Sequence, residues 1–204
     1  MRISHKHRFI FISKPRCASE SMRKALDAYS DISSNGDTNS PFYHHTTLSR
    51  TRSLFLEKGW DFEGYFKFTT LRNPWDMIVS LYFFAKTDLN GIEFWRNSPA
   101  HQPERLMPFK QWILTGKPGR FYSLQNFVCD QNGKNLADHV VKIETMEKDA
   151  AYIEDRLGLK LDIAVSNRTK HKHYSEYYDR ETAEIIRSRF AHDIEFGKYE
   201  FAPK

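Results

Sequence analysis

Three groups of side chains in this sequence could act on an anionic ligand. The segment Lys14–Ser21 carries two cations among small and hydroxyl residues, and Arg72 is followed eight residues later by Ser80. His44 and His45 stand next to each other between these two groups. Arginine and lysine donate hydrogen bonds to phosphate or sulfate groups, and a neutral imidazole accepts a proton near neutral pH. These residue types therefore indicate anion binding combined with proton transfer.

The segment Lys14–Ser21 lies where a strand is expected to give way to a helix. The apolar run Arg8–Ser13, bounded by charge and proline, predicts a short buried strand, and the residues from Ser19 to Tyr29 predict a helix. Backbone N–H groups and the dipole at such a helix start favour an anion. The segment contains no glycine and lacks the G-x-x-x-x-G-K-S/T signature of nucleoside triphosphatases. Taken alone, it is equally consistent with an ordinary strand–helix turn that carries surface cations.

Arg72 follows a second predicted strand, Tyr65–Leu71, and precedes a strong helix start. In the sequence Asn73–Asp76, an asparagine cap is followed by proline in the first turn and an acid at the third position. The helix is expected over Pro74–Lys86, which places Ser80 about two turns into it. A strand-end arginine and a helix serine could hold one phosphate between them. Alternatively, Arg72 pairs with a carboxylate and Ser80 only fills space.

Strands and helices alternate along the rest of the chain. A third strand is expected near His139–Ile143, a helix over Thr145–Leu157, and a long last helix capped by Asp179. This alternation predicts an α/β fold with a central, mainly parallel sheet flanked by helices, in a single domain over residues 1–204. Ligands of such folds bind beyond the carboxyl ends of the strands. Both cation-bearing loops lie at such ends, so we expect them to face one site.

Composition narrows the class of protein. The formal net charge is +5, which favours anionic partners or reflects a solvated basic surface. The two cysteines, Cys17 and Cys129, match no metal motif and argue against a disulfide scaffold, so we expect a cytoplasmic protein without a metal. No run approaches the roughly 18 apolar residues of a membrane span. The spread-out charge and the lack of a recognition motif argue against a nucleic-acid binder.

Together, the first two groups resemble the two cofactor motifs of sulfotransferases that use 3′-phosphoadenosine 5′-phosphosulfate (PAPS). Residues Pro15–Ser21 resemble the 5′-phosphosulfate loop, commonly P-K-T/C-A/G-G/S-T-S in carbohydrate-type members (sulfotransferase family 2-like). Residues Arg72–Tyr82 match the 3′-phosphate motif R-N-P-W-D-x-x-V-S-x-Y. His45-Thr46-Thr47, Lys142–Met146 and the carboxy-terminal residues are also similar to the family pattern, so the resemblance covers nearly the whole chain. It implies a three-layer, P-loop-like α/β fold.

The resemblance also implies a role for each matching position. Arg72 and Ser80 would hold the 3′-phosphate of the cofactor. The residues that would wrap its 5′-phosphosulfate are Lys14, Arg16, Cys17, Ala18, Ser19, Glu20 and Ser21. Cations of the basic loop 168–174 would close over the cofactor, and the sequence does not choose among Arg168, Lys170 and Lys172.

The implied reaction is sulfuryl transfer to an acceptor hydroxyl, which leaves 3′,5′-adenosine diphosphate as the product. Catalysis of this kind depends on positioning and on charge stabilisation, so Arg16 or Lys14 would stabilise the leaving group without a metal. A histidine would remove the acceptor proton. His45 is the first candidate for this base, His44 is the runner-up, and the more distant candidates are His171 and His173.

Two positions depart from the family pattern. Arg16 replaces the usual lysine with a planar, forked cation. Glu20 replaces the usual threonine, and its carboxylate would repel a phosphosulfate unless it turns away or pairs with Arg16 or Arg23. These departures motivate an alternative, a catalytically weak relative that binds adenosine 3′,5′-diphosphate or an anionic glycan without turnover. The missing Gly-Lys-Ser/Thr signature argues against a P-loop kinase.

The acceptor and the oligomeric state are not determined by the sequence. A sugar hydroxyl is the first expectation because the resemblance is closest to carbohydrate-type members, and lipid, small-alcohol or peptide acceptors stay open. The stretches Ser30–Tyr43 and Asp88–Arg105 are expected to line the acceptor side. Four side chains there could meet an anionic sugar or lie on a solvated loop: Trp95, Arg96, His101 and Arg105.

Overall fold

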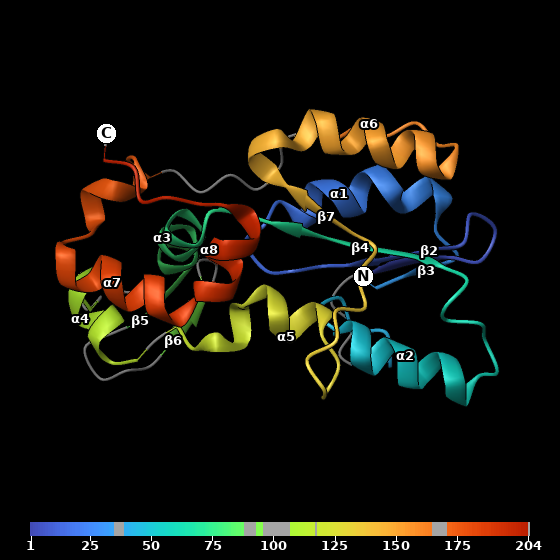
Figure 1. Ribbon diagram of the computed structural model, residues 1–204, viewed down its shortest axis with the longest axis horizontal. Coiled ribbons are helices and arrows are strands. Elements are labelled where there is room, and N and C mark those ends of the chain that lie inside the picture. Colours follow the sequence, from blue (N-terminus) through green and yellow to red (C-terminus); the bar gives the residue numbers. More distant parts are fainter. Residues whose placement is uncertain (35–38, 88–92, 96–106, 117, 165–170, 204) are drawn as a thin grey trace. The chain divides into compact units, whose positions relative to one another are not determined.

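The computed structural model describes residues 1–34, 39–87, 93–95, 107–116, 118–164 and 171–203 (Figure 1). The chain divides into two compact units, which we treat one at a time. The sheet unit consists of Met1–Arg72 and Tyr122–Asn167, and the helical unit of Asn73–Phe121 and Arg168–Lys204.

The sheet unit is built on a five-stranded sheet with the order β3-β1-β2-β4-β7. Its strands are β1 (Arg2–Ser4), β2 (Phe9–Ile12), β3 (Ile32–Ser33), β4 (Phe66–Leu71) and β7 (His139–Lys142). β2 pairs in parallel with β4, and β4 with β7, whereas β1 runs antiparallel to both β2 and β3. Four strands therefore share one direction, which confirms the prediction of a mainly parallel sheet. The carboxyl ends of β2, β4 and β7 consequently lie along one edge of the sheet.

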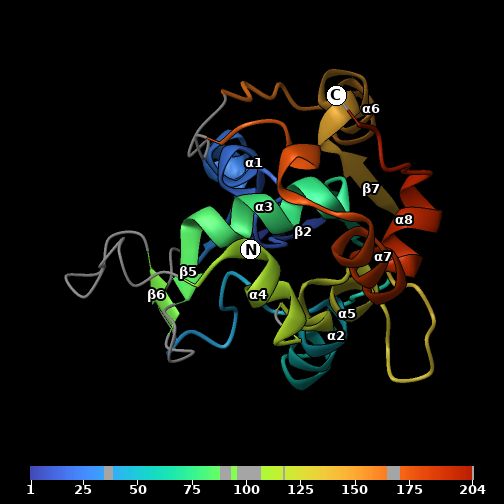
Figure 2. The ribbon, with the colours of Figure 1, turned by 90° about the vertical axis from the view of Figure 1, so that its left-hand side faces the viewer.

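Helices cover both faces of this sheet. They are α1 (Ser19–Leu26), α2 (Leu48–Glu57), α5 (Leu124–Val128) and α6 (Met146–Leu157). Figures 1 and 2 show α1 and α6 on one side of the sheet and α2 and α5 on the other. The crossovers between neighbouring parallel strands thus pass over the sheet faces, as parallel pairing requires.

Aromatic side chains fill the core between the sheet and the pair α1 and α6. Phe68, at the centre of β4, is fully buried, and its ring centroid lies 5.2 Å from that of Phe11 and 6.1 Å from that of Phe9. Met22 of α1 and Ile153 of α6 close the same cluster from the helix side. These residues come from the short apolar runs of β2 and β4 and from the apolar faces of α1 and α6. Their burial is what fixes β4 between its two neighbours.

The helix ends follow most of the sequence signals. The Thr47 hydroxyl accepts from the Arg50 N–H at the start of α2, and Gly158 ends α6 with a φ of 64°. Two helix ends differ from the expectation. The helix expected over Thr145–Leu157 begins at Met146, and the Thr145 hydroxyl donates to Asp149 instead of accepting from the first turn. The first helix ends at Leu26, and a 3₁₀ turn continues it to Tyr29.

The helical unit is assembled around a very apolar helix, α3 (Pro74–Phe84). Its other elements are β5 (Ala85–Thr87), β6 (Glu93–Trp95), α4 (Phe109–Leu114), α7 (Arg180–Arg189) and α8 (Ala191–Gly197). The Asn73 side chain accepts from the Trp75 N–H, as predicted for the cap of α3. The Trp75 indole in turn donates to the Ala183 carbonyl at 3.0 Å, which ties α3 to α7.

The last helix differs from its prediction. Asp179 caps α7 as expected, because its carboxylate accepts from the Thr182 N–H while the Thr182 hydroxyl bonds back to the cap. The single long helix that we expected is instead divided at Phe190, whose backbone leaves the helical region. That ring is buried, so packing of Phe190 takes precedence over continuing the helix.

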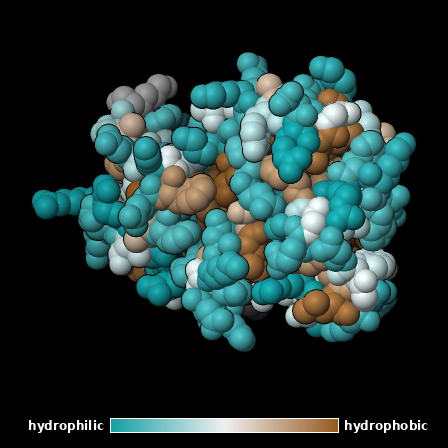
Figure 3. All heavy atoms as spheres, turned by 45° about the vertical axis from the view of Figure 1, so that its right-hand side comes forward, coloured by the Kyte–Doolittle hydropathy of each residue, from teal (hydrophilic) through white to brown (hydrophobic). Residues whose placement is uncertain are grey.

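The large apolar side chains that stay exposed in the described part of the chain are scattered. They are Leu56, Leu114, Phe121, Tyr152 and Phe196. Figure 3 shows one face of the molecule, which is mainly hydrophilic with small separate hydrophobic areas. Single exposed apolar residues of this kind are normal and carry no functional meaning.

A pair of alanine substitutions tests the assigned core. Phe68→Ala removes a ring from the centre of the aromatic cluster, so we expect the free energy of unfolding to fall by about 3–5 kcal/mol. Leu56→Ala, at a side chain that is 69% exposed, should change it by less than about 0.5 kcal/mol. Urea unfolding followed by circular dichroism measures both. Equal losses in the two variants would contradict the placement of the core.

Candidate functional site

The loop between β2 and α1 turns sharply without a glycine. Arg16 has a φ of 59° and Ala18 a φ of 52°, both in the left-handed region that glycine enters without strain. Ala18 is also the cap residue of α1 and supplies no side-chain hydrogen bond to the first turn. The loop thus reaches the start of the helix through two strained residues. A backbone held in this way is typical of a binding loop.

Burial separates the two cations of this loop. Lys14 is fully buried, and its Nζ lies 3.5 Å from the Cys17 Sγ. Arg16 is only half-buried. Ser19 and Ser21, in the first turn of α1, are buried as well. Arg16 is therefore the more accessible of the two cations that the sequence left open.

Arg72 meets this loop within the sheet unit. It directly follows β4, which lies beside β2 in the sheet, and Thr69 Oγ1 donates to the Ile12 carbonyl at 2.7 Å. The Arg72 Nη1 in turn donates to the main-chain carbonyl of Arg16 at 3.4 Å. The parallel pairing of two strands thus brings together residues that are 56 positions apart.

Glu20 pairs with a cation, Lys24, that was not among the partners we named for it. Its Oε1 lies 3.1 Å from Lys24 Nζ, one helical turn on. The expected ion pair with Arg23 was wrong, because the Arg23 Nη1 instead donates to the Ser13 Oγ at 3.0 Å. Positions three and four residues on share the helix face of Glu20, so spacing alone could not choose between them.

His45 is oriented by the end of β2. Its Nδ1 lies 2.6 Å from the main-chain carbonyl of Ser13, and a carbonyl can only accept, so Nδ1 carries the hydrogen. The lone pair of Nε2 is then left to accept a proton. Burial, the largest cause, acts together with repulsion from Arg23 and the Met1 amine to lower the pKa of His45 to about 4, against the opposing effect of the Ser13 hydrogen bond. The ring is therefore neutral at neutral pH.

His44 lies against His45 but lacks such an anchor. The two ring centroids are 4.0 Å apart. Burial and repulsion from His45 lower the pKa of His44 to about 3, and the described residues offer its buried Nδ1 no hydrogen-bond partner. Its main-chain carbonyl accepts from the Met1 amine at 3.0 Å. Of the two histidines, His45 has the geometry of an oriented base.

Ser13 and Arg23 are site residues that the sequence reasoning missed. Ser13 was treated as the end of a strand, and Arg23 only as a partner for Glu20. The one available signal was that Ser13 directly precedes the loop. Its role depends on contacts with residues 10 and 32 positions away, which no local pattern reveals.

The remaining predicted residues belong to the helical unit or lie outside the described residues. Ser80 is fully buried on α3. The Lys172 ammonium lies 3.5 Å from a Glu176 carboxylate oxygen. The His171 ring stacks on Phe83 with centroids 6.0 Å apart. The positions outside the described residues are Arg168, Lys170, Arg96, His101 and Arg105.

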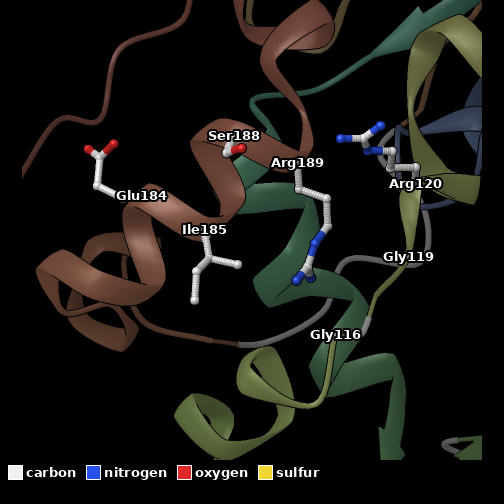
Figure 4. Close-up of a pocket in the computed structure, with 7 residues that line it drawn as sticks. All are labelled: Gly116, Gly119, Arg120, Glu184, Ile185, Ser188 and Arg189. Carbon is white, nitrogen blue, oxygen red and sulfur yellow. The ribbon is translucent and has the colours of Figure 1, made fainter.

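A separate depression of about 630 Å³ lies in the helical unit (Figure 4). Its lining residues are Gly116, Gly119, Arg120, Glu184, Ile185, Ser188 and Arg189, none of them a predicted site residue. Figure 4 shows Glu184 directed away from the arginines, and its carboxylate pairs with Arg187 at 3.0 Å.

The cations of this depression have a structural explanation. Arg189 Nη1 donates to the Pro118 carbonyl at 3.0 Å, and burial together with repulsion from Arg120 lowers the pKa of Arg189. Both α4 and α7 end here, and arginine charge is favourable at the negative end of a helix dipole.

The described part of the chain offers neither a metal site nor a membrane-spanning helix. Within it, no three histidine, cysteine, aspartate or glutamate side chains are grouped so that they could hold a metal ion. None of the described helices is both long and apolar enough to span a membrane.

Comparison with known proteins gives one match. The sequence profile of the Sulfotransferase family matches residues 1–200. No curated protein and no solved structure matches the chain significantly. The profile thus covers the segment Lys14–Ser21, Arg72, and the neighbouring histidines His44 and His45.

A matched pair of glycine substitutions tests the strained loop. Ala18→Gly should raise the free energy of unfolding by about 0.5–1 kcal/mol, because glycine enters the left-handed region freely and is a better cap than alanine. Ala25→Gly, inside the same helix, should lower it by about 1 kcal/mol. Urea titrations compare the two variants. A loss of stability in both would argue against the left-handed conformation at Ala18.

Proposed function

The chain belongs to the sulfotransferase family, and we propose that it uses PAPS to sulfate an acceptor hydroxyl, in the first instance that of a carbohydrate. Membership of this family supports sulfuryl transfer as the reaction class. We further propose that residues 1–204 act as a single domain with a three-layer, P-loop-like fold. The free thiols of Cys17 and Cys129 support a cytoplasmic location.

The loop residues fit the phosphosulfate end of the donor. We assign Lys14 and the residues from Arg16 to Ser21 to this end, and two observations support the assignment. The contact of Arg72 with the Arg16 carbonyl holds the Arg72 guanidinium against the loop. The Glu20 carboxylate, which would repel the donor, is paired with Lys24.

The 3′-phosphate is assigned to Arg72 and Ser80. The position of Arg72 at the end of β4 supports its part in this assignment. The assignment of Ser80 rests on the match of its motif, as does that of the loop cations Arg168, Lys170 and Lys172.

His45 is the proposed base, and its hydrogen bond to Ser13 is the observation that carries the mechanism. When bound, PAPS supplies the sulfuryl group, and 3′,5′-adenosine diphosphate leaves. The His45 Nε2 accepts the proton of the acceptor hydroxyl. The oxygen of that hydroxyl meanwhile attacks the sulfur in line with the bond to the leaving phosphate. Arg16, the accessible cation of the loop, stabilises the negative charge that develops on the leaving phosphate. Lys14 contributes its charge from the buried side of the loop.

Binding and transfer assays separate this proposal from binding without turnover. We expect 3′,5′-adenosine diphosphate to raise the melting temperature, and adenosine 5′-monophosphate to raise it much less. Arg72→Gln should weaken binding of the diphosphate. Arg50→Gln removes an exposed charge that pairs with Glu57 and should not.

Sulfate transfer from PAPS is then measured on panels of desulfated glycans, alcohols and peptides. Binding with transfer supports the proposal and identifies the acceptor class. Binding without transfer to any acceptor favours the catalytically weak alternative, and no binding of either nucleotide overturns the proposal.

Alanine variants of the two histidines test the assignment of the base. His45→Ala should lower kcat by roughly 10²–10⁴-fold, as expected for loss of a general base. His44→Ala should have a much smaller effect. Because burial lowers the pKa of His45 to about 4, the acid limb of kcat/KM should lie near pH 4 and not near 6.5. An equal loss in the two variants, or an acid limb near 6.5, would contradict the assignment.

A further inference from the structure

Arg23 reaches from α1 to the end of β2. Its Nη1 donates to the Ser13 Oγ at 3.0 Å, and its side chain is only partly exposed. Within the described part of the chain, no carboxylate lies at ion-pair distance from this guanidinium. The nearest acid along the helix, Glu20, pairs with Lys24. Arg23 thus forms no ion pair there, although the charges of Glu20 and Asp27 partly offset the burial that lowers its pKa.

Ser13 connects this charge to His45. Its hydroxyl accepts from Arg23, and its main-chain carbonyl lies 2.6 Å from the His45 Nδ1. The guanidinium thus hydrogen-bonds to the hydroxyl, and the imidazole to the main-chain carbonyl, of one fully buried residue. Movement of the Arg23 side chain would displace the group that orients the ring.

The other groups around His45 add positive charge or none. The neutral ring of His44 lies 4.0 Å away, and the Tyr43 ring 5.9 Å away. The Met1 amine bonds to the His44 carbonyl. Arg2, on β1, pairs with Asp27, whose charge also acts on Arg23 and on the Met1 amine. In the described structure, no carboxylate faces the His45 ring to stabilise it as a cation.

These surroundings affect how His45 titrates. Burial is the largest cause of its lowered pKa, the Ser13 hydrogen bond opposes burial, and the charge of Arg23 is the next cause that lowers it. The same charge contributes to the lowered pKa values of His44 and of the Met1 amine. Arg23 thus acts on His44, on His45 and on the Met1 amine, which lie beside one another.

We propose that Arg23 is a positioning residue for the base: it fixes Ser13, which orients the imidazole, and its charge keeps the ring neutral with Nε2 ready to accept a proton. This inference rests on the role of His45 in the proposed function. In the reaction, the acceptor oxygen bonds to sulfur as the bond from sulfur to the phosphate oxygen breaks. The electron pair goes to that phosphate, and the acceptor proton goes to Nε2.

Histidine titration by NMR tests this directly, without donor or acceptor. In the unmodified chain, the ¹⁵N shifts of His45 should report a proton on Nδ1 and a pKa near 4. Arg23→Gln should raise that pKa by roughly one unit, since a like charge is removed, whereas Arg23→Lys keeps the charge and should restore most of the depression. Arg50→Gln removes an exposed charge elsewhere and should change nothing. An unchanged pKa in Arg23→Gln, or a proton on Nε2, would overturn the proposal.

Ser13→Ala separates the orienting contribution from the charge. It removes the hydroxyl that holds Arg23 but keeps the carbonyl that holds His45. We expect a smaller rise in the pKa of His45 than in Arg23→Gln, and a lowered kcat at an unchanged donor affinity. A variant with the wild-type titration and wild-type kcat would contradict the link through Ser13. Because this variant retains the charge, it provides a test even where Arg23→Gln fails to fold.

Activity profiles decide whether the titration matters for catalysis. In Arg23→Gln, the acid limb of kcat/KM should move upward by the same amount as the pKa of His45. A raised acceptor KM with an unmoved acid limb would overturn the positioning role and make Arg23 a ligand contact. A shifted titration in a protein that transfers no sulfate would support the electrostatic inference while the proposed function fails.

Discussion

The parallel pairing of β2 with β4 is the constraint on which the rest of the sheet unit depends. It sets Ile12 opposite Thr69, so that the two strands end at the same edge of the sheet. The loop after β2 and the arginine after β4 then meet without further support from distant elements. The pairing itself is held by the aromatic rings that bury both strands against α1 and α6. Apolar packing of the two strands thus determines where the loop after β2 and Arg72 lie.

Polar contacts around Ser13 add a second level of order. Its carbonyl and its hydroxyl each hold one basic side chain, so a single buried residue connects a strand end, a helix and the histidine segment. The loop beside it depends on left-handed backbone at Arg16 and Ala18 in place of glycine. Strain in the loop and neutrality of the histidines are both sustained by packing around them. This agrees with the general observation that binding loops are strained where the scaffold is rigid.

The three parallel strands and most helix ends could be predicted from the sequence, because apolar runs, caps and glycines are local signals. β1 and β3 could not, since strands of three and two residues carry no periodicity, and β1 contains a buried arginine. The partner of Glu20 was likewise out of reach, and the sequence ranked His45 ahead of His44 without showing what orients either ring. Both depend on which group lies at the end of a strand, which only the folded chain determines.

The charge of Arg23 beside the histidines has a kinetic consequence. An imidazole that has taken up a proton beside the Arg23 guanidinium lies next to a like charge, and it is a strong acid for a histidine. Such a ring gives its proton to water soon after the product forms. Recovery of the starting state is then fast, and it is not expected to limit the number of turnovers per second. The lowered pKa thus makes His45 a weaker base, but the ring loses its proton faster after each turnover.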